Sequence, residues 1–324
     1  MYPEGYTVVN VVDLESYVKG VIPSEVPSSY GMEALKAHVD DSVNFQVYNK
    51  QNQTPETVAA VDETKGQVLS YKGDIIETYY YSTSYGHTGD YEAWNLDKDA
   101  YGYLQGVWVR SEENPIDLSD EKSFLDYISN VDSACYESDL KYFRWNTVLD
   151  FQGKDETLLH TIADRKEHQP EAISYYKDAS KTEKTDSCSN FGSLQAIKVV
   201  KRNQSGVILE LELDFQNGAV SVQSEYNMRA ILGCGITNIN LLDGSSVEMS
   251  ILPSAYISIQ AKGDGTYAVL GGGYGHGIGM SQNGAQKLCG QGFDYKRILN
   301  YFYQDTELTE LYQPQNMTKE EGGA

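Results

Sequence analysis

Near the start of the sequence, the residue best suited to catalysis is Glu25, in the stretch GVIPSEVPSSYGMEALKA over residues 20–37. Pro23 fixes its own backbone, and each of the two flanking prolines biases the residue before it toward an extended conformation. We therefore expect Glu25 to leave a stiff, extended backbone just before a helix. A carboxylate held so firmly beside apolar neighbours suits a general acid, because burial raises a carboxyl pKa. The alternative is a first-turn glutamate that stabilises a helix N-terminus.

A second candidate is the glycine-rich stretch GGGYGHGIGMSQNGA over residues 271–285. Glycines at this density let a backbone take positive φ angles and approach a ligand closely. Tyr274 and His276 stand on this frame, Ser281 is a natural N-cap for the helix that follows, and Gln282 is a further candidate for ligand binding. The stretch lacks the Gly-Lys-Ser/Thr ending of a P-loop and the acidic partner of a dinucleotide fingerprint. The alternative is a strand-to-helix turn that needs glycine for packing.

A third candidate is YYYSTSYGHTGD over residues 79–90. Ser82, Thr83 and Ser84 form a row of hydroxyls at a strand end, and His87 follows shortly after. Hydroxyls at this density suit recognition of a sugar or an amide. A serine hydrolase built from Ser84, His87 and Asp90 is disfavoured, because no G-x-S-x-G elbow is present and the three residues lie too close in sequence.

The histidines and cysteines predict no metal site and no cofactor. The histidines form neither H-x-x-x-H nor H-E-x-x-H,. His38 precedes Asp40 and Asp41, which leaves open a site shared by a histidine and carboxylates, or a solvated role at a helix end. No C-x-x-C pair occurs, so a structural zinc is not expected. One disulfide and four free thiols both remain open for the cysteines, which are Cys135, Cys188, Cys234 and Cys289.

The charge of the chain argues against polyanionic partners. With 47 acidic against 25 basic residues, the formal net charge is −22. Binding nucleic acid or an anionic membrane surface needs a basic patch, and none is visible. The 26 tyrosines suit the walls of a glycan site, although aromatic residues are also favoured in sheets. The sequence has no apolar window long enough for a transmembrane helix and no signal peptide. We therefore expect membrane contact only through an N-terminal anchor absent from this chain.

Helices and short strands must position these residues. The pattern predicts an α+β fold with mixed, mainly antiparallel sheets and helices, in two lobes flanking a substrate groove. It includes a hairpin over 64–84, a polar region over 154–190 that has an amphipathic stretch near ETLLHTIADR and is loop-like after it, strands within 194–224, and a helix over 224–232. The expected division has four parts: an N-terminal lobe with Glu25 and the Ser-Thr-Ser loop at 1–120, a partly mobile connecting segment at 121–190, a C-terminal lobe with the glycine-rich stretch at 191–312, and a disordered tail at 313–324.

Three of these segments together resemble one family. The motifs YVKGVIPSEVPSSYGMEALKA, YSTSYGHT…YLQGV and GGGYGHGIGMSQNGAQKL occur here in the order typical of the stage II sporulation protein D (SpoIID) / LytB amidase-enhancer family. The resemblance extends over roughly residues 10–310 and includes YFRW at 142–145 and SEYNMRAIL at 224–232.

The resemblance implies a bacterial, extracytoplasmic cell-wall protein, in sporulation or cell-wall remodelling. Sporulation members of the family are lytic transglycosylases that cut peptidoglycan glycan strands without water and leave a 1,6-anhydro ring. The family's catalytic glutamate falls on Glu25. The implied binding residues are Ser82, Thr83, Ser84, His87, Tyr274, His276, Ser281 and Gln282. The implied partners are the glycan strands and a cell-wall amidase.

One departure from the family pattern affects this expectation. Ala37 is followed directly by His38, so an arginine-bearing helical segment of the family is missing. We therefore expect catalysis to be weakened or lost. Members that bind zinc use one His and two Cys in this region, where this chain has residues such as Asn44 and Phe45.

The sequence leaves three hypotheses for the function: a lytic transglycosylase, a non-catalytic glycan-binding module that activates an amidase, and a metal-dependent hydrolase.

Overall fold

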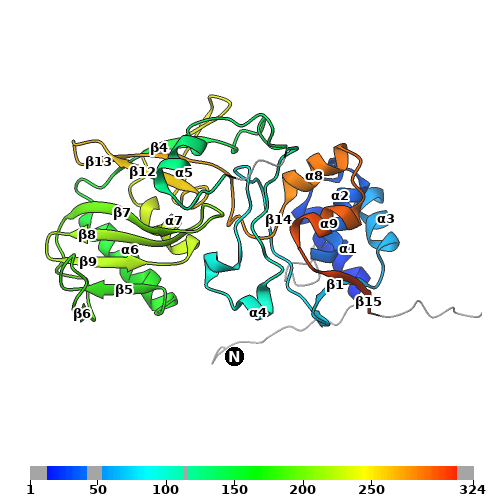
Figure 1. The fold of residues 1–324 in the computed structure, drawn as a ribbon, viewed down its shortest axis with the longest axis horizontal. Coiled ribbons are helices and arrows are strands. Elements are labelled where there is room, and N and C mark those ends of the chain that lie inside the picture. Colours follow the sequence, from blue (N-terminus) through cyan, green and yellow to red (C-terminus); the bar gives the residue numbers. More distant parts are fainter. Residues whose placement is uncertain (1–12, 42–52, 113–115, 312–324) are drawn as a thin grey trace, which may run out of the picture. The chain divides into compact units, whose positions relative to one another are not determined.

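The computed structural model describes residues 13–41, 53–112 and 116–311. The chain divides into two compact units that are described separately (Figure 1). Unit 1 consists of residues 1–78, 288–300 and 305–324, and unit 2 consists of residues 79–287 and 301–304. The four-part division expected from the sequence, with boundaries near 120 and 190, stays a prediction. So does the groove between two lobes.

Unit 1 is a small helical unit with a three-stranded antiparallel sheet, in the strand order β15-β1-β2. The hairpin turn at Lys72 and Gly73, both with positive φ, joins β1 to β2 where the sequence predicted a hairpin. The apolar faces of α1, α2 and α3 form the core, which includes Val18, Ile22 and Leu35. The elements are α1 (Leu14–Glu25), η1 (Ser28–Tyr30), α2 (Met32–Asp41), α3 (Pro55–Glu63), β1 (Gln67–Tyr71), β2 (Asp74–Ile75) and β15 (Glu307–Glu310).

Polar residues fix where the helices of unit 1 begin. The Asp13 side chain accepts a hydrogen bond from the backbone N–H of Ser16 and starts α1. Thr54 forms a capping box with Thr57 at the start of α3, and Pro55 occupies the first turn, where a missing N–H costs nothing,. Ser28 and Ser29, which precede α2, lie in the 3₁₀ turn η1.

Unit 2 contains two five-stranded sheets, a short parallel pair, and the helices that cover them (Figure 1). The strand orders are β11-β10-β4-β13-β12, β6-β5-β9-β8-β7 and β14-β3. The strands are β3 (Tyr80–Tyr81), β4 (Trp145–Asp150), β5 (Ile173–Tyr176), β6 (Lys184–Thr185), β7 (Leu194–Arg202), β8 (Ile208–Phe215), β9 (Gly218–Val222), β10 (Ile239–Leu241), β11 (Ser246–Val247), β12 (Ile257–Ala261), β13 (Thr266–Gly271) and β14 (Met280–Ser281).

The helices of unit 2 pack their apolar faces against these sheets. The core runs through both five-stranded sheets and includes Trp145, Leu158, Leu211 and Ile231. The helical elements are η4 (Tyr91–Trp94), α4 (Lys98–Tyr101), α5 (Glu121–Ile128), α6 (Asp155–His168) and α7 (Glu225–Gly233); α8 (Gln282–Gly290) and α9 (Tyr295–Phe302) follow, each with residues in both units.

The α+β class and the mainly antiparallel sheets are confirmed. In the region 154–190, α6 covers the expected amphipathic stretch, but the expectation of a loop after it is wrong, because β5 and β6 lie there. All four cysteines are free thiols. Within the described ranges no helix is long and apolar enough to cross a bilayer. The expected disordered tail at 313–324 lies outside the described residues, as do Asn44 and Phe45.

Candidate functional site

Glu25 is the last residue of α1, which corrects the expectation of an extended backbone before a helix. Pro23 lies inside the helix, where it has no N–H for the carbonyl four residues earlier,. The helix continues only two residues further, and the backbone becomes extended at Val26 (φ −134°, ψ 135°). The two prolines therefore fix the end of a helix.

The position of Glu25 at the C-terminal end of α1 argues against the alternative that its carboxylate stabilises the N-terminus of this helix. The C-terminal end of a helix carries partial negative charge and favours cations, so a carboxylate there does not stabilise its own helix. Glu25 is half-buried, and its neighbours Val21, Ile22 and Val26 are buried in the core of unit 1. The carboxylate thus stands on a rigid helix end with apolar residues on the inner side.

His38, a candidate metal ligand, lies in the interior of unit 1. Its ring is fully buried, and Nδ1 is 2.6 Å from the carbonyl oxygen of Ala34. Burial lowers the pKa of His38 to about 4, so the ring is neutral at neutral pH,. The expected solvated role at a helix end is therefore wrong. Across the described ranges, no group of three His, Cys, Asp or Glu side chains is placed to hold a metal, and the expectation of no metal stays a prediction.

In unit 2 the structure brings together the two other predicted segments, which are nearly 200 residues apart. Met280 and Ser281 in β14 pair in parallel with Tyr80 and Tyr81 in β3. Just beyond, the N–H of Thr83 donates to the carbonyl of Tyr274 at 3.1 Å, and the reverse bond is 2.8 Å. We call residues 80–89 and 272–283 of this paired region the platform.

The glycines of the platform are needed for this close pairing. Gly279 has φ 78°, and a Cβ there would lie 1.9 Å from the carbonyl oxygen of Tyr79. At Gly275 (φ 114°) a Cβ would lie 2.7 Å from the Cβ of Tyr81. Both positions exclude other residues on steric and conformational grounds. Packing therefore accounts for glycines that the sequence alone could equally assign to ligand approach.

A buried carboxylate, Glu137, joins the two strands of the platform to a third segment. Its Oε1 accepts hydrogen bonds from the N–H of Ser84 (3.0 Å) and from the hydroxyl of Ser281 (2.7 Å), and the hydroxyl of Ser84 donates to Oε2. Burial raises the pKa of Glu137 to about 7, although the serine hydrogen bonds act in the opposite direction. Sequence reasoning missed Glu137, because its neighbours form no motif and its partners are distant in sequence.

The predicted binding residues of the platform fall into two groups by exposure. The first group is buried and holds the platform together: Thr83, Ser84, His87 and Ser281. The second group is half-buried and reaches its surface: Ser82, Tyr274, His276 and Gln282. The binding role predicted for all eight residues stays a prediction.

Two buried side chains show how the first group works. Ser281 accepts from the N–H of Gly284 at 3.2 Å, which is the N-cap geometry expected from the sequence,. His87 is 6% exposed, bonds through Nδ1 to the carbonyl of Thr88 at 2.6 Å, and packs edge-on against Trp108. Burial lowers the pKa of His87 to about 4, so the imidazole carries no charge at neutral pH.

The half-exposed residues form the outer surface of the platform. Tyr274 stacks on Tyr142 with ring centres 4.4 Å apart and planes inclined by 14°. Nδ1 of His276 accepts from the N–H of Ile278 (3.1 Å), which places the proton on Nε2, where it donates to the carbonyl of Tyr80 (2.8 Å). Burial lowers the pKa of His276 to about 4. The platform thus offers stacked rings and hydroxyls to a ligand, with its histidines neutral.

Comparison with known protein families decides which family this arrangement belongs to. The model of "Stage II sporulation protein" matches residues 2–39, which include Glu25. A model described as a domain of unknown function (DUF8618) matches residues 86–279, more than half of the chain. The "Amidase enhancer" of Bacillus subtilis is 27% identical over 90% of this chain and 40% of its own length. The chain therefore belongs to the DUF8618 family, and it is similar over most of its length to amidase-enhancer and stage II sporulation D proteins.

Two further relatives align with almost the whole chain. An uncharacterized protein of Brachyspira hyodysenteriae is 25% identical over 95% of this chain and 70% of its own length. "Stage II sporulation protein D" of Bacillus subtilis is 23% identical over 93% of this chain and 76% of its own length. The chain therefore spans less than half of the amidase enhancer and about three quarters of the sporulation protein.

Proposed function

We propose that the protein is a peptidoglycan lytic transglycosylase with Glu25 as its single acid and base. Similarity to sporulation and amidase-enhancer proteins supports a role at the cell wall. The observation that carries the finer proposal is Glu25 itself. It is a half-buried carboxylate at the fixed end of a helix, within the segment matched by the sporulation-protein model.

The proposed reaction needs only one carboxyl group. Glu25 gives its proton to the glycosidic oxygen between N-acetylmuramic acid and N-acetylglucosamine as the bond to the muramyl C1 breaks. The C6 hydroxyl oxygen of the same muramyl residue then bonds to C1, and its proton returns to the Glu25 carboxylate. The product is a 1,6-anhydro-muramyl end, and no water is consumed. Hydrolytic glycosidases, in contrast, usually use a pair of carboxyl groups.

The platform residues supply the proposed binding surface for the glycan. Tyr274 and Tyr142 expose part of a stacked pair, and rings of this kind can stack on a sugar while their hydroxyls form hydrogen bonds,. Ser82 and Gln282 are half-buried residues of the same platform. We place this activity outside the cytoplasm, in the cell envelope or the space around an engulfed forespore, as expected for a protein that acts on peptidoglycan.

The test is mass spectrometry of peptide-stripped glycan strands after incubation with the protein. We expect anhydro-muramyl products from the native chain, and a rate lowered about 10²- to 10⁴-fold in Glu25→Gln, the usual contribution of general acid–base catalysis. Glu56→Gln is the matched control, because Glu56 is an exposed glutamate in the same unit. Equal product from native protein and Glu25→Gln would refute the catalytic role of Glu25.

A second candidate function is activation of a partner amidase without catalysis. It is favoured by the name of the amidase-enhancer relative and by the missing helical segment after Ala37. Under this hypothesis, neither the native chain nor Glu25→Gln yields anhydro products, yet both bind glycan and raise the rate of a purified cell-wall amidase. Cleavage by the native chain alone would exclude a purely binding role.

A further inference from the structure

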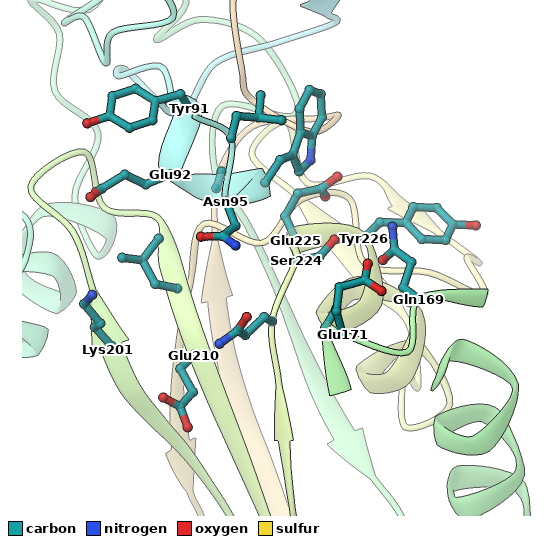
Figure 2. A pocket seen from close by; sticks show the side chains of 16 residues that line it. Tyr91, Glu92, Asn95, Gln169, Glu171, Lys201, Glu210, Ser224, Glu225 and Tyr226 are labelled. Atoms are coloured by element: carbon teal, nitrogen blue, oxygen red, sulfur yellow. The ribbon is translucent and has the colours of Figure 1, made fainter. Parts of the chain in front are cut away.

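Unit 2 contains an open pocket of about 850 Å³, lined by residues from η4, from the turn before β5, from β7 and β8, and from the start of α7 (Figure 2). A volume of this size falls in the usual range for small-molecule sites. The whole lining lies within residues 86–279, the region matched by the model of a domain of unknown function. The pocket therefore lies outside the segment that contains Glu25, and the role proposed for Glu25 assigns it no function.

Negative charge dominates the pocket. Four glutamates line it, against one cation, Lys201. Two of the four are neutralised, because Glu210 pairs with Lys181 at 3.1 Å and Glu225 pairs with Arg229 at 3.0 Å.

The other two carboxylates, Glu92 and Glu171, have no cationic partner in the part of the chain that the structure describes. Glu92 accepts a hydrogen bond from the neutral amide of Asn203 at 3.0 Å, and the exposed Glu171 forms no ion pair with a described residue. Figure 2 shows both side chains at the pocket. Two carboxylates left without a counter-ion in a concave site attract a cation.

Aromatic rings and amides supply the rest of the lining. Tyr226 is 46% exposed, and Tyr91 and Trp94 are half-buried. Such rings offer a sugar an apolar face and, in tyrosine, a polar tip. The Tyr226 ring already attracts a cation, because the Arg165 guanidinium lies 4.9 Å from its centre,. The amides that can meet hydroxyl groups are Asn95, Gln169 and Gln223. This combination suits a ligand that is rich in hydroxyl groups and carries a positive charge.

The wall that carries Tyr91, Glu92 and Trp94 is held in place before any ligand arrives. Asp90 caps η4 by accepting from the N–H of Glu92 at 3.0 Å, and its carboxylate also accepts from Ser205 (2.8 Å) and Asn203 (2.8 Å). A wall that is already ordered loses little freedom on binding.

The same wall is continuous with the platform. The Trp94 ring lies 5.0 Å from the His276 ring and 4.9 Å from the Tyr79 ring. A ligand chain that occupies the pocket therefore lies next to the residues proposed to bind glycan.

Among the described strands at the pocket, β7 has one unpaired side because it ends its sheet, but the strands behind the rest of the lining do not favour an extended peptide. Peptides commonly add to a sheet through a free strand edge. Here β8 is paired on both sides by β7 and β9, and β5 is paired on both sides by β6 and β9. The surface offered to a ligand by β8 is its side chains, Leu209 and Glu210, and not its backbone.

We propose that this pocket binds a saccharide that carries a free amino group, such as glucosamine within an oligosaccharide. In an oligomer with an amino group on each sugar, separate ammonium groups meet Glu92 on one side of the pocket and Glu171 on the other (Figure 2). The sugar rings meet Tyr226, Tyr91 and the amides. The inference extends the proposed function to a second ligand contact and does not depend on catalysis by Glu25. A glucosamine oligomer contains no muramyl residue, so it tests binding without cleavage.

The experiment is isothermal titration calorimetry of the full chain with glucosamine tetramer and with N-acetylglucosamine tetramer at pH 6, where free amines are protonated. We expect one site per chain and at least about tenfold tighter binding of the amino form, equivalent to one good charged contact. Glu92→Gln and Glu171→Gln should each weaken that binding about tenfold. Glu248→Gln, which removes an exposed glutamate elsewhere in unit 2, should leave it unchanged.

A lysine tetramer separates the proposed site from simple attraction to an acidic protein, and Tyr226→Ala tests the contribution of the ring. We expect the lysine tetramer to bind more weakly than the amino sugar, and Tyr226→Ala to weaken only the sugar. The proposal is overturned if Glu248→Gln weakens binding as much as Glu171→Gln, if the acetylated tetramer binds equally well, or if neither sugar binds. Unchanged circular dichroism of each variant excludes misfolding as the cause.

Discussion

Glu137 makes the stability of unit 2 sensitive to pH. A carboxyl whose pKa is raised in the folded state, here from 4.5 to about 7, binds its proton more tightly in that state than in the unfolded chain,. Its stabilising effect is complete below pH 4.5 and is lost as the pH rises toward 7. The hydrogen bonds from Ser84 and Ser281 stabilise the carboxylate form of Glu137, but they do not offset the full free-energy cost of burying its charge.

We therefore predict that Glu137→Gln becomes more stable relative to the native chain as the pH rises. The difference in unfolding free energy should shift by roughly 3 kcal/mol between pH 4.5 and pH 7, the equivalent of the pKa change. Urea denaturation of both proteins at four pH values in this range measures it. The exposed Glu248→Gln should show no such shift, and a constant difference for Glu137→Gln would contradict the prediction.

The buried histidines act in the opposite direction. Because burial lowers the pKa values of His38, His87 and His276 to about 4, each contributes stability that is present above the unfolded value of 6.5 and is lost as the pH falls toward 4. Only the comparison of matched variants, as proposed for Glu137, separates these overlapping effects.

At the scale of elements, the pairing of β3 with β14 depends on how closely two backbones approach. Gly279 and Gly153 both have φ above 70°, but only at Gly279 would a Cβ meet another atom, the carbonyl oxygen of Tyr79. At Gly153 there is nothing within 4 Å. This pair of glycines separates conformational strain from steric conflict.

We predict that Gly153→Ala costs about 1–3 kcal/mol, the range for a strained backbone residue. Gly279→Ala should cost more than about 4 kcal/mol, because the strand must also move. Thermal or urea unfolding of the two variants measures the difference. Similar losses for both would mean that the platform can shift to accept a side chain.

The elements that could be predicted from the sequence are those that form because of residues close together in the chain. Strands β7, β8 and β9 and helix α7 were predictable, because β-branched runs and an apolar helical pattern end at glycine or asparagine within each segment. Strands β5 and β6 were not, because their four and two residues become strands only by pairing, as Tyr175 does with Val220. Burial of Val18 and Ile22 in the core likewise carries α1 through Pro23 against local preference.

The candidate site was predictable to a similar degree. Glu25 and both platform segments are visible in the sequence as short motifs. The role of Glu137 is not, because its contacts with Ser84 and Ser281 span 53 and 144 residues. The pocket in unit 2 is also the product of long-range folding, since Glu92, Glu171 and Tyr226 come from three separate segments.

At the scale of the whole molecule, unit 1 is completed by the end of the described chain. The first strand of its sheet, β1, pairs with β15 in the register Leu69 to Leu308, and the N–H of Leu311 donates to the carbonyl of Gly66 at 2.7 Å. The Tyr295 hydroxyl donates to the Gln67 side chain at 2.8 Å. The unit that carries Glu25 is therefore built from both ends of the sequence.

We predict that ending the chain at Asp305, which removes β15, lowers the stability of unit 1 and spares unit 2. Hydrogen exchange should speed up in peptides from residues 14–41 and stay slow in those from 208–233, in accordance with the separate cores. A chain that ends at Leu311 keeps β15 and serves as the control. Equal loss of protection in both units would show that they unfold together.

The pairing of β1 with β15 also sets an order of events during synthesis. The hydrogen bond between Ser70 and Glu307 spans 237 residues, so the N-terminal helices leave the ribosome long before their sheet can close. Unit 2 is translated in between, and all of its residues are synthesised before Glu307. Domains generally fold from the N-terminus onward. In this protein the helices around Glu25 are synthesised first, but the sheet of their unit is completed last. A nascent chain, or one cut short before Glu307, therefore carries Glu25 in a unit whose sheet lacks its last strand.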